Sequence, residues 1–271
     1  MTPEQPIDPD IRRMSVRGLA ASYTDEGSGD PPLVFIHGVP GSVRDFRWLA
    51  AALRRVDSDV RILRINMPGF AGTEESLGGD MSVGDRAAFV AEVVEQLDLR
   101  AFVLCGHSLG GAVAVAVATL VPERVSRLAL ISSVGITPHR AYRAIPISPV
   151  LARVFCSSFG HRFLSAGLRK AFIALGFPSS TPTDELHSTM RAVGALRWPH
   201  VRANAESLGN LHIPTTIFNA EDDPLVESAI AVELAAALHA DLQLFPTGGH
   251  NIQKTRAIEI AEILMRSPRT E

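Results

Sequence analysis

The hydrophobic positions of this chain fall into short runs that alternate with longer stretches of helical spacing. Such runs predict strands at Leu33–Ile36, Val60–Ile65, Ala101–Cys105, Val125–Ile131, Thr215–Phe218 and Asp241–Phe245. Between and after the strands, apolar residues recur with helical spacing over 44–56, 82–97, 225–239 and 251–266. Strands that alternate with helices in this way indicate a parallel sheet with helices on both faces.

One stretch, 111–121, fits two periods. Val113, Val115 and Val117 alternate with alanines, which is typical of a strand. The stretch directly follows a predicted strand and a glycine-rich turn, however, and two strands in that order would need a hairpin. We therefore predict a helix that is buried on all sides and ends before Pro122, because proline cannot continue a helix.

Two segments lie outside the alternating pattern. Residues 1–13 are polar and rich in proline, which predicts a disordered tail. Between 135 and 208 the strands stop, and prolines separate short apolar stretches, as expected of a helical insertion. The predicted organisation is a core of residues 14–134 and 209–271 with a helical cap of residues 135–208.

Composition narrows the class of protein. The chain has 271 residues, 46% of them hydrophobic and 20% charged, with a net charge of −3. These values predict a globular protein that does not bind nucleic acid. The stretch Gly110–Val121, which is apolar or glycine apart from Thr119, is too short to span a bilayer.

The termini and cysteines bear on where the protein works. Its first residues lack the apolar stretch of a signal peptide. The only two cysteines, Cys105 and Cys156, do not make a disulfide framework. We expect a cytoplasmic protein, either a monomer or a homodimer.

A candidate nucleophile follows the predicted strand Ala101–Cys105. Gly106-His107-Ser108-Leu109-Gly110 matches the nucleophile elbow, in which a sharp turn from strand to helix lifts the serine hydroxyl out of the sheet. Glycines on either side let the neighbouring backbone approach closely. The following Gly111 would support the same tight packing.

A serine nucleophile needs a base, and the base needs an orienting acid. His250 lies just beyond the last predicted strand, at the edge where ligands bind in open α/β sheets. The acid is expected after Thr215–Phe218, where Glu221, Asp222 and Asp223 occur. Asp223 is the first candidate and Asp222 the second, since the unused carboxylates could cap the next helix.

The tetrahedral intermediate of acyl transfer needs two preset hydrogen-bond donors. We expect one from the main-chain amide of Leu109, directly after the serine. The other should come from the loop after Leu33–Ile36, with the amide of Val39 as the candidate. His37 in the same loop is expected to organise the loop, because His250 already fills the role of base.

These motifs together resemble the α/β-hydrolase family, in its serine hydrolase (esterase/lipase-like) branch with a helical cap. The resemblance covers the chain from about Met14 to Arg266. It is carried by His37–Gly41, Met67–Phe70, Gly106–Gly111, Glu221–Val226 and Gly249-His250. Relatives often have Asp at Asn66, Gly at Ala71 and Gly at Ala220, and none of these departures affects a member of the triad.

The resemblance implies a doubly wound, mostly parallel sheet with a cap inserted after the sixth strand, and a catalytic triad of Ser108, Asp223 and His250. It implies hydrolysis of a carboxylic ester, or a related acyl bond, of a small or medium-sized apolar substrate. The same triad would also serve a C–C bond hydrolase of the meta-cleavage type, a thioesterase or an acyltransferase. A non-catalytic ligand-binding protein is the more distant alternative. No metal ion or cofactor is expected.

The cap offers a further hint about the partner. From Arg124 to Thr183 the chain contains no Asp or Glu, while apolar and basic residues interleave. A solvated cap face over an apolar underside accounts for this pattern. The sharper hypothesis is an apolar pocket with a cationic rim, suited to anionic amphiphiles or to an anionic lipid surface.

Overall fold

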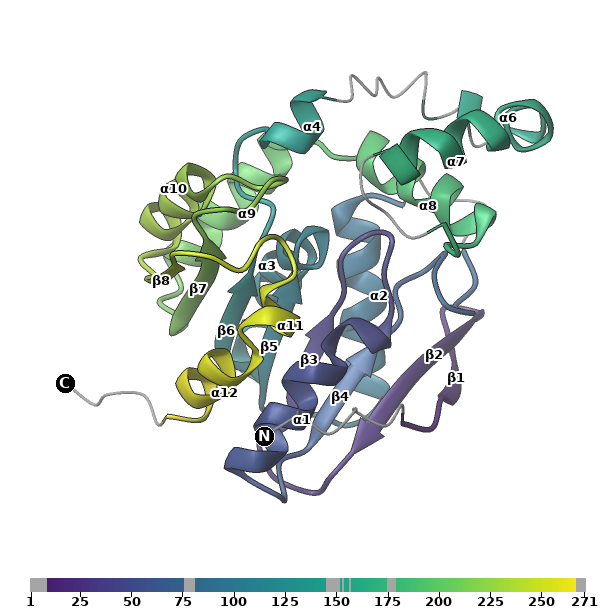
Figure 1. The fold of residues 1–271 in the computed structure, drawn as a ribbon. Coiled ribbons are helices and arrows are strands. Elements are labelled where there is room, and N and C mark those ends of the chain that lie inside the picture. The colour runs from purple at the N-terminus through teal and green to yellow at the C-terminus, as the bar shows by residue number, and fades with distance from the viewer. Residues whose placement is uncertain are drawn as a thin grey trace.

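One mixed sheet forms the centre of the computed structural model, which describes residues 9–75, 81–144, 152, 154, 155, 157–174 and 179–266. Its strands are β1 (Arg12–Val16), β2 (Leu19–Glu26), β3 (Leu33–Ile36), β4 (Ile62–Ile65), β5 (Phe102–His107), β6 (Val125–Ile131), β7 (Thr215–Ala220) and β8 (Asp241–Phe245). Their order is β1-β2-β4-β3-β5-β6-β7-β8. β2 runs antiparallel to both of its neighbours, β1 and β4. The remaining neighbours, in the order β4-β3-β5-β6-β7-β8, are parallel to one another (Figure 1). The predicted α/β class is confirmed.

The N-terminal hairpin was not predicted. β1 begins at Arg12, so the end of the predicted tail, residues 12 and 13, belongs to a strand. Residues 1–8 of that tail lie outside the described residues. The hairpin turns through Arg17 and Gly18, both with positive φ (53° and 78°), as a two-residue turn of type I′ requires. β1 is an exposed edge strand, so its sequence has no apolar run from which a strand could be predicted.

Two layers of helices cover the sheet. α1 (Arg47–Val56), α11 (Ile252–Thr255) and α12 (Ala257–Met265) pack on one face, and α2 (Val83–Gln96), α3 (Leu109–Leu120), α9 (Trp198–Gly209) and α10 (Ser228–Leu238) pack on the other. Alternate residues of β3 pack against the helices on opposite faces of the sheet. Val34 and Ile36 join the core on one side, and Leu33 and Phe35 join the core on the other. This is the doubly wound arrangement that the sequence predicted.

The ambiguous stretch 111–121 is a helix, as predicted. α3 starts directly after Ser108, and its residues from Leu109 to Ala118 are all buried. Burial on every side explains the misleading pattern, because a helix without a solvent face needs no polar stripe. The helix therefore lies at the centre of the molecule, with the elbow at its first turn.

A cap follows β6, the sixth strand. It contains α4 (Arg140–Ala144), α6 (Ser158–Phe163), α7 (Ser165–Ala174) and α8 (Thr183–Gly194), at the top of Figure 1. Its own small core includes Leu168, Phe172 and Met190. α9 differs, because its residues Val201 and Ala205 join the main core beside α3. α9 therefore packs against the α/β body, although the predicted cap extends to residue 208.

Candidate active site

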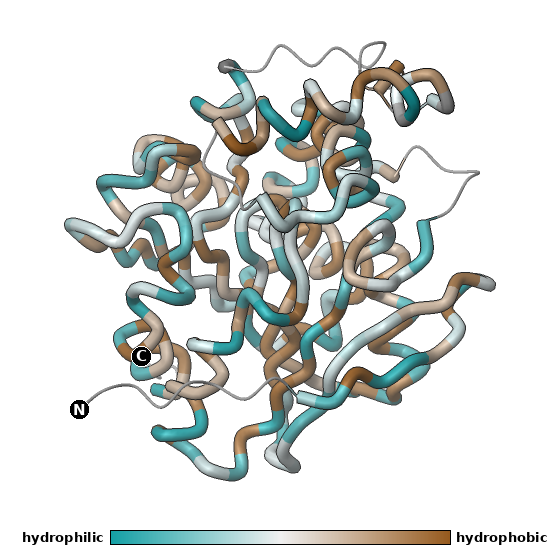
Figure 2. Tube along the Cα trace, turned by 45° about the vertical axis from the view of Figure 1, so that its right-hand side comes forward, coloured by the Kyte–Doolittle hydropathy of each residue, from teal (hydrophilic) through white to brown (hydrophobic). Residues whose placement is uncertain are grey.

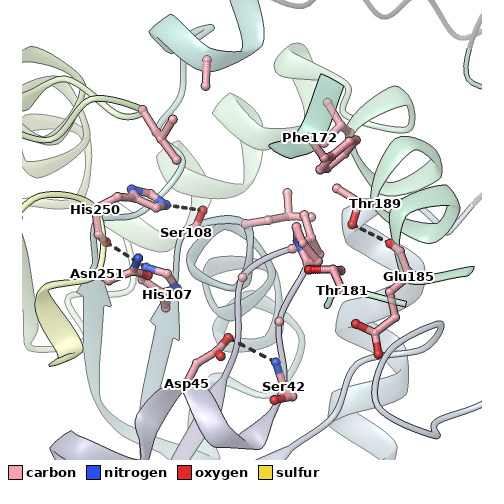
Figure 3. A pocket seen from close by; sticks show the side chains of 18 of the residues that line it. Ser42, Asp45, His107, Ser108, Phe172, Thr181, Glu185, Thr189, His250 and Asn251 are labelled. Atoms are coloured by element: carbon pink, nitrogen blue, oxygen red, sulfur yellow. Dashed lines mark hydrogen bonds between the residues drawn. The ribbon is translucent and has the colours of Figure 1, made fainter. Parts of the chain in front are cut away.

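The turn between β5 and α3 holds Ser108 in a strained conformation. Its φ of 53° and ψ of −122° are uncommon for a residue with a side chain. The turn is possible because glycines flank it. A Cβ on Gly106 would lie 2.4 Å from the carbonyl oxygen of Gly110, and a Cβ on Gly110 would lie 2.3 Å from that of Ile36. The predicted elbow is therefore present, with the serine hydroxyl facing a pocket (Figure 3).

Three residues far apart in the sequence meet at this hydroxyl. The Nε2 atom of His250 lies 3.0 Å from the Oγ atom of Ser108, although 142 residues separate them. On the other side of the ring, Nδ1 of His250 lies 2.9 Å from Oδ2 of Asp223. Nδ1 donates to the carboxylate, which leaves Nε2 free to accept the serine proton. The structure thus joins Ser108, His250 and Asp223 in one chain of hydrogen bonds.

The two candidate acids occupy different positions. Asp223 is buried, and its Oδ1 accepts from the amides of Leu225 and Val226 at 2.8 and 3.0 Å. The exposed Asp222 instead accepts from the amide of Gly249 at 2.8 Å. Asp222 therefore tethers the loop that carries His250 without touching the imidazole. The helix after these residues begins at Ser228 rather than at 225, so neither carboxylate caps it.

The surroundings of Asp223 keep it charged. Burial on its own would raise the pKa of this carboxyl, but the hydrogen bond and charge of His250 and two main-chain amides outweigh it. The net result is a pKa below the ordinary value. An ionised Asp223 next to Nδ1 would stabilise the imidazolium that forms when His250 takes up a proton.

His107, within the elbow motif, was not considered from the sequence. The Nε2–H of His107 donates to the main-chain oxygen of His250 at 3.0 Å, and the two rings lie 5.0 Å apart (Figure 3). Burial, and then the charge of His250, lower the pKa of His107 to about 3, so its ring is neutral. His107 therefore holds the backbone of His250 from the strand that carries Ser108. Its position directly before the serine was the available signal.

His37 lies beneath the loop that follows β3. Its Nε2 accepts from the amide of Met67 at 2.9 Å, and its Nδ1–H donates to the carbonyl of Gly38 at 2.6 Å. Burial lowers the pKa of this imidazole to about 4, which keeps it neutral. The ring links the loops after β3 and β4, which agrees with an organising role.

The amides expected to stabilise an oxyanion border the same pocket. Val39 and Leu109 both line it beside Ser108. Within the part of the chain that the structure describes, neither of their N–H groups has a hydrogen-bond acceptor. Leu109 is the first residue of α3, where amides have no partner in the helix. Both donors are therefore free for a substrate atom.

The pocket has a volume of about 870 Å³ and lies between the elbow and the cap. Its apolar lining comes from both the core and the cap and includes Leu109, Val134, Phe172, Met190, Val193 and Leu225. Its polar lining includes Ser42, Arg44, Asp45, Arg47, Thr181 and Glu185, of which Thr181 and Glu185 lie on the same side as Phe172 (Figure 3). This mixed lining was not apparent from the sequence, since most of these residues belong to no motif.

Two carboxyl groups that line the pocket, those of Asp45 and Glu185, are partly desolvated. Burial raises the pKa of Asp45 to about 6, despite the amide of Ser42, which donates to it. Burial also raises the pKa of Glu185, which accepts from the amide of Ala71 at 3.1 Å. In weak acid the pocket lining therefore carries less negative charge than two carboxyl groups with ordinary pKa values would give it.

Among the described residues, no group of three or more His, Cys, Asp or Glu side chains could hold a metal ion. Cys105 is buried in β5, and burial raises the pKa of its thiol to about 12, so it is not a nucleophile at neutral pH. Cys156 lies outside the described residues. No helix in the described ranges is both long and apolar enough to cross a membrane.

Relatives of known type share parts of this sequence. The family model of the alpha/beta hydrolase fold matches residues 31–153. The dihydrolipoyllysine-residue acetyltransferase component of the acetoin cleaving system of Pseudomonas putida is 34% identical over 111 residues, which cover 41% of this chain and 29% of that protein. The chain thus spans less than a third of that relative's length. The 2-hydroxy-6-oxo-2,4-heptadienoate hydrolase of Pseudomonas putida strain F1 is 24% identical over 267 residues, covering 91% of this chain and 92% of that protein.

A solved structure agrees with the fold. An alpha/beta hydrolase fold protein from Burkholderia ambifaria superposes with a TM-score of 0.76 at 20% sequence identity, covering 94% of this chain and 96% of its own. At this identity the likeness concerns the fold. Together with the family match and the strand order, it shows that the chain has the α/β-hydrolase fold.

Proposed function

We propose that this protein is a serine hydrolase that cleaves carboxylic esters of small or medium-sized apolar acids. The observation that carries the proposal is the uninterrupted chain of hydrogen bonds from Ser108 through His250 to Asp223. A ligand-binding protein has no need for such a chain at the floor of its pocket. Every member lies at hydrogen-bond distance before any substrate arrives.

The geometry supports acyl transfer in two steps. His250 accepts the proton of Ser108 at Nε2 as Oγ attacks the substrate carbonyl, and Asp223 stabilises the resulting imidazolium. The amides of Val39 and Leu109 donate to the oxyanion of the tetrahedral intermediate. When the intermediate collapses, the departing alcohol takes the proton from His250, and the acyl group stays on Ser108.

The second step uses the same groups in reverse. His250 takes a proton from a water molecule, and the hydroxide attacks the acyl carbon. The carboxylic acid leaves, and the proton returns from His250 to Oγ of Ser108. The apolar lining residues, among them Leu109, Val134 and Phe172, favour an uncharged acyl chain, because each buried CH₂ gains about 0.8 kcal/mol.

A covalent probe tests the proposed nucleophile. We expect a fluorophosphonate to label the protein once, at Ser108, as read from the intact mass and the modified peptide. The S108A variant should remain unlabelled, while D222N, which leaves the hydrogen-bonded chain intact, should be labelled like the wild type. Folded wild-type protein that resists the probe would refute the proposal and favour a ligand-binding function.

Hydrolysis of a C–C bond is the second candidate. It is favoured by the 24% identity to the 2-hydroxy-6-oxo-2,4-heptadienoate hydrolase, which extends over 91% of this chain. A substrate panel separates the two reactions. Turnover of p-nitrophenyl esters with a kcat/KM at least 100-fold above that for a 2-hydroxy-6-oxo-dienoate supports the esterase, and the reverse ratio supports the C–C hydrolase.

A further inference from the structure

The outer tip of the cap exposes a pair of aromatic rings. Phe159 and Phe163 lie on α6 with 59% and 62% of their surface exposed, and their ring centroids are 5.1 Å apart. The guanidinium of Arg162 lies 5.4 Å from the ring of Phe163, and the exposed Val154 lies just before the helix. We refer to Val154, Phe159, Arg162 and Phe163 as the cap apex. Adjacent apolar side chains that are this exposed form a contiguous patch, and such patches mark interaction sites.

The cap apex lies in a segment without negative charge. No Asp or Glu occurs from Arg124 to Thr183, and Lys170 is exposed on the neighbouring helix α7. The hydrophobic stretches of the cap lie at the upper right of Figure 2, on the outside of the molecule. The whole chain, in contrast, has a net charge of −3. The exposed apolar side chains of the apex therefore lie beside Arg162 and Lys170, in a segment of the sequence that has no acidic residue.

The apex is also connected to the pocket. Phe172 of α7 lines the pocket beside the elbow, while the exposed Ile173 follows it on the same helix. α6 and α7 are separated by Leu164 alone. α7 therefore runs from the apex, at its Ser165 end, to the pocket lining at Phe172 near its other end.

We propose that the cap apex docks on the surface of an anionic lipid bilayer. The two phenylalanine rings would enter the boundary between headgroups and acyl chains, and Arg162 and Lys170 would face the lipid phosphates. Charge favours this occupant over a second copy of the chain. A twofold dimer through the same face would bring both Arg162 guanidinium groups into one interface, and the segment from Arg124 to Thr183 has no carboxylate to pair with them.

Docking has a consequence for the substrate. Esters of amphiphiles held in the bilayer would then be the substrates to which Ser108 is brought. This consequence rests on the proposed function, whereas docking itself does not. Binding and catalysis are therefore tested separately.

Vesicle sedimentation tests the docking. The full chain with S108A, which prevents turnover of lipid, is mixed with vesicles of phosphatidylcholine alone or of equal parts phosphatidylglycerol and phosphatidylcholine. We expect binding to the anionic vesicles only, and release at high salt. F159S/F163S should bind at least tenfold more weakly. K170E should bind the anionic vesicles at least about fivefold more weakly, because each Lys or Arg near an anionic membrane contributes about 1 kcal/mol to binding.

A matched control separates the apex from exposed apolar residues in general. V232S/I258S changes two side chains that are 52% and 55% exposed on α10 and α12. This variant should bind anionic vesicles like its parent, and both double variants should hydrolyse a water-soluble ester at the wild-type rate when Ser108 is present.

Three results would overturn docking. They are unchanged vesicle binding by F159S/F163S, equal binding to neutral vesicles at all salt concentrations, and a dimer in ultracentrifugation that F159S/F163S dissociates. The last result would show that a second copy covers the apex. If no ester is hydrolysed although anionic vesicles are bound, the proposed function fails and docking stands.

Discussion

At the scale of single residues, two adjacent carboxylates have different tasks. Asp223 is buried and shares its oxygens among His250, Leu225 and Val226. Asp222 is exposed and holds the loop through the amide of Gly249. The sequence narrowed the acid to these neighbours but could not choose by geometry, because one residue of difference along a loop reverses the direction of a side chain. Only the path of the loop separates them.

A pair of isosteric substitutions distinguishes the two carboxylates. D223N should lower kcat by about 10⁴, because an uncharged amide neither orients the imidazole nor stabilises its charged form. D222N should lower kcat less than tenfold. Steady-state kinetics on a soluble ester measures both. Equal losses in the two variants would contradict the proposed assignment.

His107 is expected to act through His250. H107F keeps a ring in place but removes the donor to the main-chain oxygen of His250. We expect kcat to fall about 10- to 100-fold with little change in KM, since small misplacements of a base are costly. H107Q, which can still donate, should recover part of the loss. A fall in thermal stability without this split between kcat and KM would assign His107 a structural role only.

At the scale of elements, the elbow depends on how closely α3 approaches β3. Ile36 of β3 pairs with Gly106 of β5, and the first turn of α3 lies directly against the end of β3. The sequence predicted the strands from Leu33 onward and the elbow, because both carry strong local patterns. It missed β1, β2 and the packing of α9 on the core. A hairpin at the edge of a sheet lacks the long apolar run that reveals a central strand. An amphipathic helix shows that one of its faces is buried, but its sequence does not show whether that face packs on the α/β core or on the cap.

Two Gly→Ala substitutions should have opposite effects. G110A would place a Cβ 2.3 Å from the oxygen of Ile36 and 2.4 Å from that of His37, so we expect a loss of about 3 kcal/mol in the free energy of unfolding. In G167A on α7 the new Cβ has nothing within 4 Å, and we expect a gain of about 0.5–1 kcal/mol from helix propensity. Urea denaturation measures both. A G110A variant as stable as the wild type would contradict the close approach.

At the scale of the whole molecule, buried titratable groups link stability to pH. His37 and His107 stay neutral, with pKa values of about 4 and 3 instead of 6.5, chiefly because of burial. Below pH 6.5 the unfolded chain takes up protons that the folded chain does not, so stability falls with pH. Asp45 has the opposite effect. Burial raises its pKa from 3.8 to about 6, so its contribution to stability rises as pH falls through this window.

The balance predicts a slope. Of these three groups, two histidines against one carboxyl leave about one proton, which contributes a fall of about 1.4 kcal/mol per pH unit in the free energy of unfolding near pH 5. The lowered pKa of Asp223 adds to this fall, and the raised pKa of Glu185 opposes it. D45N removes the opposing carboxyl of Asp45 and should steepen the slope by about 1.4 kcal/mol per pH unit. Urea denaturation at a series of pH values measures this. A shallower slope in D45N would show that Asp45 is ionised throughout.

The order of the strands has a consequence for synthesis. The proposed nucleophile follows β5 near the middle of the chain, but the proposed base follows β8 and is 142 residues further on. Chains emerge from the ribosome N-terminus first. A nascent chain that already contains the strained elbow therefore still lacks His250, and it carries a serine without a partner until the last strand is in place. The proposed triad can therefore assemble only after β8 and the loop that follows it have been made.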